Sequence, residues 1–175
     1  QSALERMARS EPLTGLLNRR GFLECLDDWF AARPSPDCRD DDRESVVCYI
    51  DLDTFKVIND RFGHSAGDAV LVAVASRLAA LVDGRGFAGR MGGDEFVLLV
   101  ECVDADERRR FRLELSEALQ GTIVVDDREI AFSGRAGFAM AGGKEGHPDP
   151  TSVLRAADID LTRAKRDRHG GAGNS

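Results

Sequence analysis

The chain has 175 residues, of which 42% are apolar and 31% are charged, and this composition is typical of one ordinary globular domain. Its 24 Lys and Arg residues stand against 31 Asp and Glu residues, which gives a net charge of −7. This balance argues against nucleic acid or an anionic membrane as the main partner. A phosphorylated small molecule is not excluded, because local charge and metal ions decide that kind of binding.

The two ends and the four cysteines give expectations about context. Cys25, Cys38, Cys48 and Cys102 lack CxxC spacing, so we expect free thiols in a reducing cytosol. We find no signal peptide and no apolar run long enough to cross a bilayer. We expect residues 1–12 to be the end of a connecting helix or linker, 13–169 one folded domain, and 170–175 a flexible tail. The predicted location is cytoplasmic, in a parent protein that is free to be membrane-anchored.

Periodicity predicts an alternation of helices with strands and hairpins. The order is α-β-α-ββ-α-ββ-α, which predicts an α/β (α+β) fold with a central mixed, largely antiparallel sheet flanked by helices. Asn18 is the expected N-cap of the first helix, and the second hairpin is expected to turn at Asp126 and Asp127. The predicted helices cover 18–33, 67–82, 104–120 and 151–167, with strands or hairpins at 46–50, 86–101 and 122–141 and an exposed loop at 34–45.

Carboxylates occur at two places where strands end. Asp51 and Asp53 follow the apolar run "VVCYI", and Asp94 and Glu95 follow two glycines in "GRMGGDEFVLLV". Taken separately, a capping Asp and an acidic turn explain these residues. If the hairpin packs beside the strand, however, Asp51 and Asp94 converge, together with Glu95 if the turn brings it near. Such a cluster needs a positive partner, and Mg²⁺ with substrate phosphates suits it.

A polar segment, "FKVINDRFGHSAGDAVL", follows the first carboxylates. Asn59 and Asp68 offer an amide and a carboxylate that match the donor and acceptor edge of guanine. A turn Asn and a helix-starting Asp are the plain alternatives. Lys56 is able to contact phosphate, although a solvated surface lysine is the commoner case, and His64 is a weak candidate by itself.

The sequence closely resembles the GGDEF domain family, the diguanylate cyclases. The resemblance rests on motifs that follow one another in order over nearly the whole chain. They are "RMGGDEF" (90–96), "DLDTFKVINDRFGHSAGDAVL" (51–71), "EPLTGLLNRRGF" (11–22, with Glu11 for the usual Asp) and the closing helix "AADIDLTRAKRD" (156–167). The family's fold is related to nucleotidyl cyclases and polymerase palm domains.

The resemblance implies a reaction and its participants. Two GTP-loaded copies of the domain face each other, and each 3′-hydroxyl attacks the α-phosphate of the partner's GTP. The products are cyclic di-GMP and two pyrophosphates, and the cofactor is Mg²⁺ or Mn²⁺. The implied partners are GTP, a second copy of the domain, an upstream sensor and, in some parent chains, a downstream phosphodiesterase domain; nucleic acid is not among them.

The resemblance also assigns roles to individual residues. Metal binding falls to the side chains of Asp51 and Asp94 and to the backbone carbonyl of Leu52. Either Asp94 or Glu95 helps to deprotonate the 3′-hydroxyl, and both remain candidates. The substrate contacts implied are Asn59 and Asp68 to guanine, Lys56 to the transition state, Lys165 to the terminal phosphates, His64 and Phe55 beside the nucleotide, and Gly92 and Gly93 leaving room for the triphosphate.

The sequence departs from the family pattern at several positions. The RxxD product site would fall on 83–86, which reads "DGRG", so we predict no product inhibition there. Thr162 replaces a Tyr, His169 replaces a phosphate-contacting Arg, and Arg135 replaces a Ser. The leading hypothesis is an active diguanylate cyclase. The alternatives are a catalytically weak or inactive GTP-binding module that regulates a neighbouring domain, such as a cyclic di-GMP phosphodiesterase, and a purely structural domain.

Overall fold

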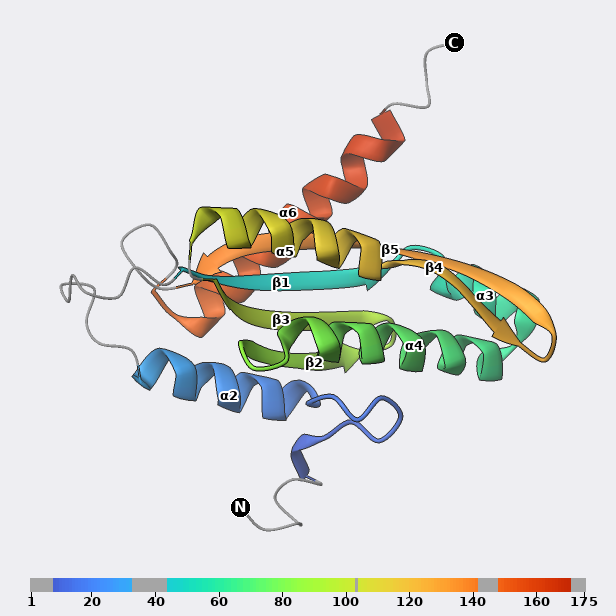
Figure 1. Ribbon diagram of the computed structural model, residues 1–175, viewed down its shortest axis with the longest axis horizontal. Coiled ribbons are helices and arrows are strands. Elements are labelled where there is room, and N and C mark those ends of the chain that lie inside the picture. The colour runs from blue at the N-terminus through green and yellow to red at the C-terminus, as the bar shows by residue number, and fades with distance from the viewer. Residues whose placement is uncertain (1–7, 33–43, 103, 142–147, 171–175) are drawn as a thin grey trace.

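The computed structural model of the chain describes residues 8–32, 44–102, 104–141 and 148–170. Most of the predicted loop at 34–45 and the predicted tail after residue 170 lie outside these residues. Figure 1 shows a single sheet with helices packed along it. The elements are α2 (Arg19–Ala32), β1 (Glu44–Leu52), α3 (Phe55–Phe62), α4 (His64–Val82), β2 (Gly86–Gly92), β3 (Glu95–Cys102), α5 (Ala105–Ala118), β4 (Gln120–Val125), β5 (Arg128–Ala141) and α6 (Pro150–Gly170).

The sheet has five strands in the order β2-β3-β1-β5-β4. Every pair of named strands runs antiparallel, and an isolated bridge between Leu17 and Gly89 is parallel, so the sheet is largely antiparallel as predicted. The predicted α+β class, with a sheet flanked by helices, is confirmed. β1 lies in the middle, paired with β3 on one side and β5 on the other, so the end of β1 is bordered by both neighbours.

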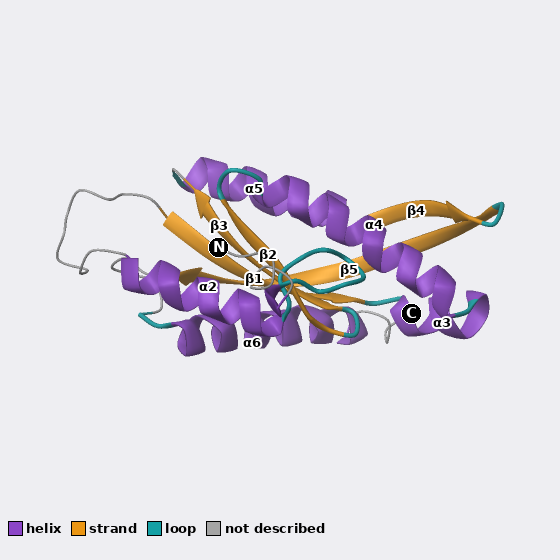
Figure 2. Cartoon of the chain, turned by 90° about the horizontal axis from the view of Figure 1, so that it is seen from below, coloured by secondary structure: helices purple, strands orange, loops and turns teal. Residues whose placement is uncertain are grey.

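Helices cover both faces of the sheet, as Figure 2 shows. One core cluster places Val46, Cys48 and Ile50 of β1 with the buried faces of α4 and α5. A second cluster places Val47 of β1 with α2 and α6. Because both faces are buried, β1 reads as a continuous apolar run rather than an alternation. The two-residue period of a strand then places Asp51 on the face covered by α6.

Two helical predictions need correction. α3 was not predicted, because it has only eight residues, of which four are polar and only Ile58 is buried. α4 begins at His64 rather than Gly67, so Asp68 lies in its second turn and does not start the helix. α3 is held by packing against α4, and a helix of this length is too short to show a clear periodicity in the sequence.

α4 has the length and mean hydropathy of a membrane-spanning helix over His64–Val82, contrary to the expectation that no apolar run of the chain is long enough to cross a bilayer. Its apolar residues include Val70, Leu71, Val74 and Leu78, and all four are buried in the core beneath the sheet. A helix that is apolar because it packs in a core meets the same criteria. The packing therefore accounts for its composition.

A predicted helix cap and a predicted turn are both present, and one close contact brings α6 onto the sheet. Asn18 caps α2, since its Oδ1 accepts from the Gly21 backbone N–H at 2.8 Å. Asp126 and Asp127 turn the second hairpin with positive φ angles of 49° and 60°. At Gly137 in β5, an added Cβ would lie 2.1 Å from the backbone nitrogen of Leu161. The absence of a side chain there allows α6 to pack directly on the sheet.

Candidate active site

The C-terminal end of β1 and the turn between β2 and β3 lie side by side at the same end of the sheet. Asp51 is directly opposite Glu95 in the β1–β3 pairing. The backbone N–H of Leu52 donates to the carbonyl of Asp94 at 3.3 Å. The packing of the hairpin beside β1, on which the predicted convergence depended, is therefore present, and it brings Asp51, Asp94 and Glu95 together.

The carboxylates of this cluster disfavour one another's ionisation. Partial burial raises the pKa of Asp94, and the charge of Asp51 raises it further. Burial is also the main reason that the pKa of Glu95 is raised, followed by the charges of Asp51 and Asp94. Lys165 from α6 contacts the Asp51 carboxylate and supplies positive charge to it. The cluster therefore carries an excess of negative charge, which a bound cation would stabilise.

The donor set fits a magnesium ion that is bound together with a substrate. Among the described residues, no group of three or more His, Cys, Asp or Glu side chains could hold a metal by itself. Asp51 and Asp94 offer two carboxylates, which is the number Mg²⁺ commonly takes from protein when phosphates and waters complete its shell. Gly92 and Gly93 have positive φ angles of 144° and 51°, and an added Cβ on either would meet nothing within 4 Å. Their surroundings leave space beside the carboxylates.

A second group of predicted residues lies on the α3–α4 pair. Asn59 in α3 faces Gly67 in α4, where an added Cβ would lie 1.9 Å from Asn59 Oδ1 and 3.2 Å from the Phe55 ring. Asn59 Oδ1 is buried and has no hydrogen-bond partner among the described residues. Such an acceptor is costly to bury unless a ligand satisfies it. Asp68, next to Gly67, is exposed.

The remaining predicted side chains differ in exposure. Lys56 and His64 are exposed on α3 and at the start of α4, and neither contributes to the carboxylate cluster in this structure. Thr162 is exposed, and its hydroxyl donates to the carbonyl of Asp158 along α6. The side chain of His169 lies outside the described residues.

Sequence reasoning missed the partner of Asp53. The guanidinium of Arg135 donates to both carboxylate oxygens of Asp53, with Nη2–Oδ1 at 2.6 Å and Nε–Oδ2 at 2.9 Å. The two residues are 82 positions apart in sequence. The only signal for their contact is the β1–β5 register, which pairs Arg135 with Asp51.

The first motif of the chain is also tied to the hairpin turn. The Glu11 carboxylate accepts hydrogen bonds from the backbone N–H groups of Leu13 and Thr14 and from the Thr14 hydroxyl at 2.7 Å. It pairs with Arg90 at 3.1 Å, and Arg90 in turn donates twice to the carbonyl of Gly93 at 2.7 and 3.0 Å. Glu11 thereby helps to hold the backbone of the turn that carries Asp94.

Glu11 should make the fold sensitive to acid. Burial acts against its charge, but the hydrogen bonds from Thr14, Leu13 and Arg90 lower the pKa from 4.5 to about 2. A lowered folded-state pKa stabilises the fold above about pH 4.5, and this stabilisation is lost as the pH falls toward 2. We expect Glu11→Gln to lower the free energy of unfolding at pH 7 by about 1–2 kcal/mol.

Urea unfolding at pH 7, 4.5 and 3 measures this effect. The difference between the wild-type chain and Glu11→Gln should shrink as the pH falls. Glu24→Gln is the matched control, since Glu24 pairs with Arg9 and Arg20 on the surface and holds no backbone turn. A difference that is independent of pH would contradict the assignment.

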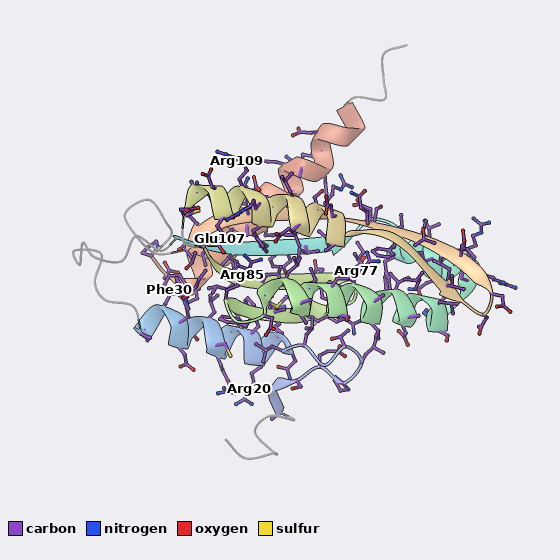
Figure 3. The ribbon with its side chains drawn as sticks, viewed as in Figure 1. Arg20, Phe30, Arg77, Arg85, Glu107 and Arg109 are labelled. Atoms are coloured by element: carbon purple, nitrogen blue, oxygen red, sulfur yellow. The ribbon has the colours of Figure 1, made fainter. Side chains whose placement is uncertain are left out.

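The segment at 83–86, where the family's product site would fall, has a structural role instead. Arg85 pairs with Glu107 and Glu114 of α5 at 3.2 Å each, and it donates to the Leu81 carbonyl at 2.9 Å. Arg85 and Glu107 are labelled in Figure 3. The absence of product inhibition stays a prediction.

The fold and the site together define a class. An antiparallel sheet with helices on both faces carries one carboxylate, Asp51, at the end of its central strand and a second, Asp94, in the neighbouring glycine turn. This is a domain suited to metal-dependent chemistry on a nucleoside triphosphate. The sequence profile of the family described as "Diguanylate cyclase, GGDEF domain" matches residues 8–170, so the chain belongs to the GGDEF domain family.

Named relatives include a diguanylate cyclase and a cyclic di-GMP phosphodiesterase. The chain is 33% identical over 168 residues to "Diguanylate cyclase DgcP" of Escherichia coli, covering 94% of this chain and 47% of DgcP. It is 32% identical over 168 residues to "Cyclic di-GMP phosphodiesterase PdeB" of Shewanella oneidensis, covering 93% of this chain and 18% of PdeB. The chain therefore spans less than half the length of either protein.

Solved structures share the fold. A sensory box/GGDEF family protein from Caulobacter crescentus matches with a TM-score of 0.78 and 32% identity, covering 91% of this chain and 99% of the other. The coiled coil and GGDEF domain of DgcB from the same organism, solved in complex with c-di-GMP, matches with a TM-score of 0.78 and 26% identity, covering 94% of this chain and 84% of the other.

Proposed function

We propose that the chain is the catalytic domain of a diguanylate cyclase, which condenses two GTP molecules into cyclic di-GMP and two pyrophosphates. The observation that carries the proposal is the meeting of Asp51, Asp94 and Glu95 at the end of the central strand, beside open glycines. The family match and the name of the relative DgcP support the choice of reaction. The activity needs two copies of the domain, each presenting one GTP to the other.

Asp51 and Asp94, with the carbonyl of Leu52, would hold Mg²⁺ or Mn²⁺, which neutralises phosphate charge and activates the 3′-oxygen when bound. Glu95, which is opposite Asp51, would accept the proton of the 3′-hydroxyl, and Asp94 is the other candidate for this role. Lys165 lies at the cluster and has a flexible stem, so its ammonium can move from Asp51 to a terminal phosphate. Lys56 is exposed on α3, shortly after Asp51 in the sequence, and would stabilise the negative charge of the transition state.

Asn59 and Asp68 would read the guanine base. The buried, unpartnered Oδ1 of Asn59 supports this role, because guanine N–H groups would satisfy it. Gly67 keeps the space in front of that oxygen clear, and Phe55 borders the same space. His64 would lie at the side of the nucleotide. Catalysis would take place in a cytoplasmic domain, with an upstream sensor in the parent chain.

Incubation of the purified chain with GTP and Mg²⁺, followed by mass identification of the products, tests the proposal. We expect cyclic di-GMP and pyrophosphate from GTP and no cyclic dinucleotide from ATP.

The second candidate is a GTP-binding regulatory module without turnover. It is favoured by the exposed Thr162, which replaces the family's Tyr and whose hydroxyl donates to the Asp158 carbonyl within α6. Calorimetric binding of GTP without any product, at high protein concentration, would support that module instead of the enzyme.

A further inference from the structure

Arg135 forms a bridge between the end of β1 and α6. All three of its guanidinium nitrogens are engaged: Nε and Nη2 with Asp53, and Nη1 with the carbonyls of Ala164 and Lys165 at 3.2 Å each. The Arg135 and Asp53 side chains are only 21% and 17% exposed. A fork held in this way has little freedom and fixes the two elements relative to each other.

The bridge ends on the turn of α6 that carries Lys165. Closer to its start, α6 is seated on β5 by the direct approach of Leu161 to Gly137. Beyond that contact α6 runs away from the sheet, as Figure 1 shows. Lys165 nevertheless reaches back to Asp51 of β1. The hydrogen bonds from Arg135 to these two carbonyls therefore tie the turn of α6 that carries Lys165 to the sheet.

The bridge also separates the two carboxylates that follow the strand. Asp53 is neutralised by Arg135, whereas Asp51 is left to Lys165 and to the acidic cluster with Asp94. Without Arg135, Asp53 would add a further negative charge near the cluster and compete for Lys165. Both effects bear on where the lysine ammonium stands.

We propose that Arg135 is a positioning residue, which orients Lys165 toward the carboxylate cluster and the phosphates of the nucleotide. This inference rests on the proposed function, because it assumes that Lys165 contacts phosphate. The competing view is an ordinary salt bridge that contributes to stability only.

A double-mutant cycle on ligand affinity separates these views. The probe is 3′-deoxy-GTP with Mg²⁺, which lacks the attacking hydroxyl and does not react, and affinity is measured by calorimetry. We expect Lys165→Ala to weaken binding about 10-fold and Arg135→Ala at least about 5-fold. The double variant should be little weaker than Lys165→Ala alone, because an absent lysine cannot be mispositioned and only the charge of the released Asp53 remains.

Three further variants guard the test against loss of folding. Asp53→Asn keeps Arg135 but weakens its hold, so it should weaken binding in the same direction. Arg135→Lys keeps the charge without the fork, and we expect it to recover thermal stability more than affinity. Arg163→Ala is the matched control, since Arg163 is an exposed cation on the same helix.

Additive losses in the cycle, or a lower melting temperature with unchanged affinity in Arg135→Ala, would overturn the positioning role while leaving the proposed function standing. Failure of the wild-type chain to bind the probe at all would instead overturn the proposed function, and the positioning role with it.

Discussion

Asp94→Asn should lose at least about 100-fold of the rate of cyclic di-GMP formation and yet fold as stably as the wild-type chain, or more stably. The loss follows from removal of a metal-binding charge beside Asp51. The stability follows from the raised pKa of Asp94, whose causes are burial and then the charge of Asp51. A carboxylate with a raised folded-state pKa opposes folding at pH 7, and neutralising it removes that cost.

Product formation by mass and the midpoint of thermal unfolding are the two measurements. Asp104→Asn is a useful control, since Asp104 is a carboxylate that caps α5 through the Glu107 N–H and follows β3 at the end away from the cluster. It should change stability little, because Asn and Asp cap helices about equally well, and it should leave the rate unchanged. An Asp94→Asn chain that keeps its rate would refute the assigned role, and one that unfolds would refute the electrostatic argument.

Gly67→Ala should weaken GTP binding by roughly 10- to 100-fold, the range expected when one good base contact is lost. The added Cβ would lie 1.9 Å from Asn59 Oδ1, so the amide must turn away from its present position. Asp68→Asn should lower the preference for GTP over ATP, because it replaces a carboxylate, which only accepts hydrogen bonds, with an amide, which both donates and accepts them. Calorimetry with GTP and with ATP measures both effects.

Ser65→Ala, an exposed change on the same helix, is the control for Gly67→Ala. Alanine favours helix over glycine, so Gly67→Ala also gains intrinsic helix stability, and a loss of binding would not reflect a weakened helix. Unchanged GTP affinity in Gly67→Ala would remove Asn59 from the base-reading role.

The features that the sequence predicted well are those written in short-range patterns. β1 is recognisable as an apolar run, α2 by the cap at Asn18, and the second hairpin by Asp126 and Asp127. The meeting of Asp51 with the glycine turn was predictable as a conditional, because antiparallel neighbours bring a strand end and a hairpin turn to one edge of a sheet.

The features that escaped prediction depend on tertiary contacts. α3 is too short, at eight residues, for its periodicity to be recognised, and it packs against α4. The Arg135–Asp53 fork joins residues 82 positions apart, and only the strand order places β5 beside β1. Lys165 reaches Asp51 across 114 positions because α6 lies over that end of the sheet. A local sequence pattern cannot reveal contacts between residues that are so far apart along the chain.

The most direct test of the central claim is the rate of cyclic di-GMP formation per mole of chain, measured with saturating GTP and Mg²⁺ over a wide range of protein concentration. A reaction that needs two GTP-loaded domains should show a specific rate that rises with concentration and then levels off as the domains pair. A specific rate of zero at every concentration, with GTP bound, would contradict the assignment of the chain as a diguanylate cyclase.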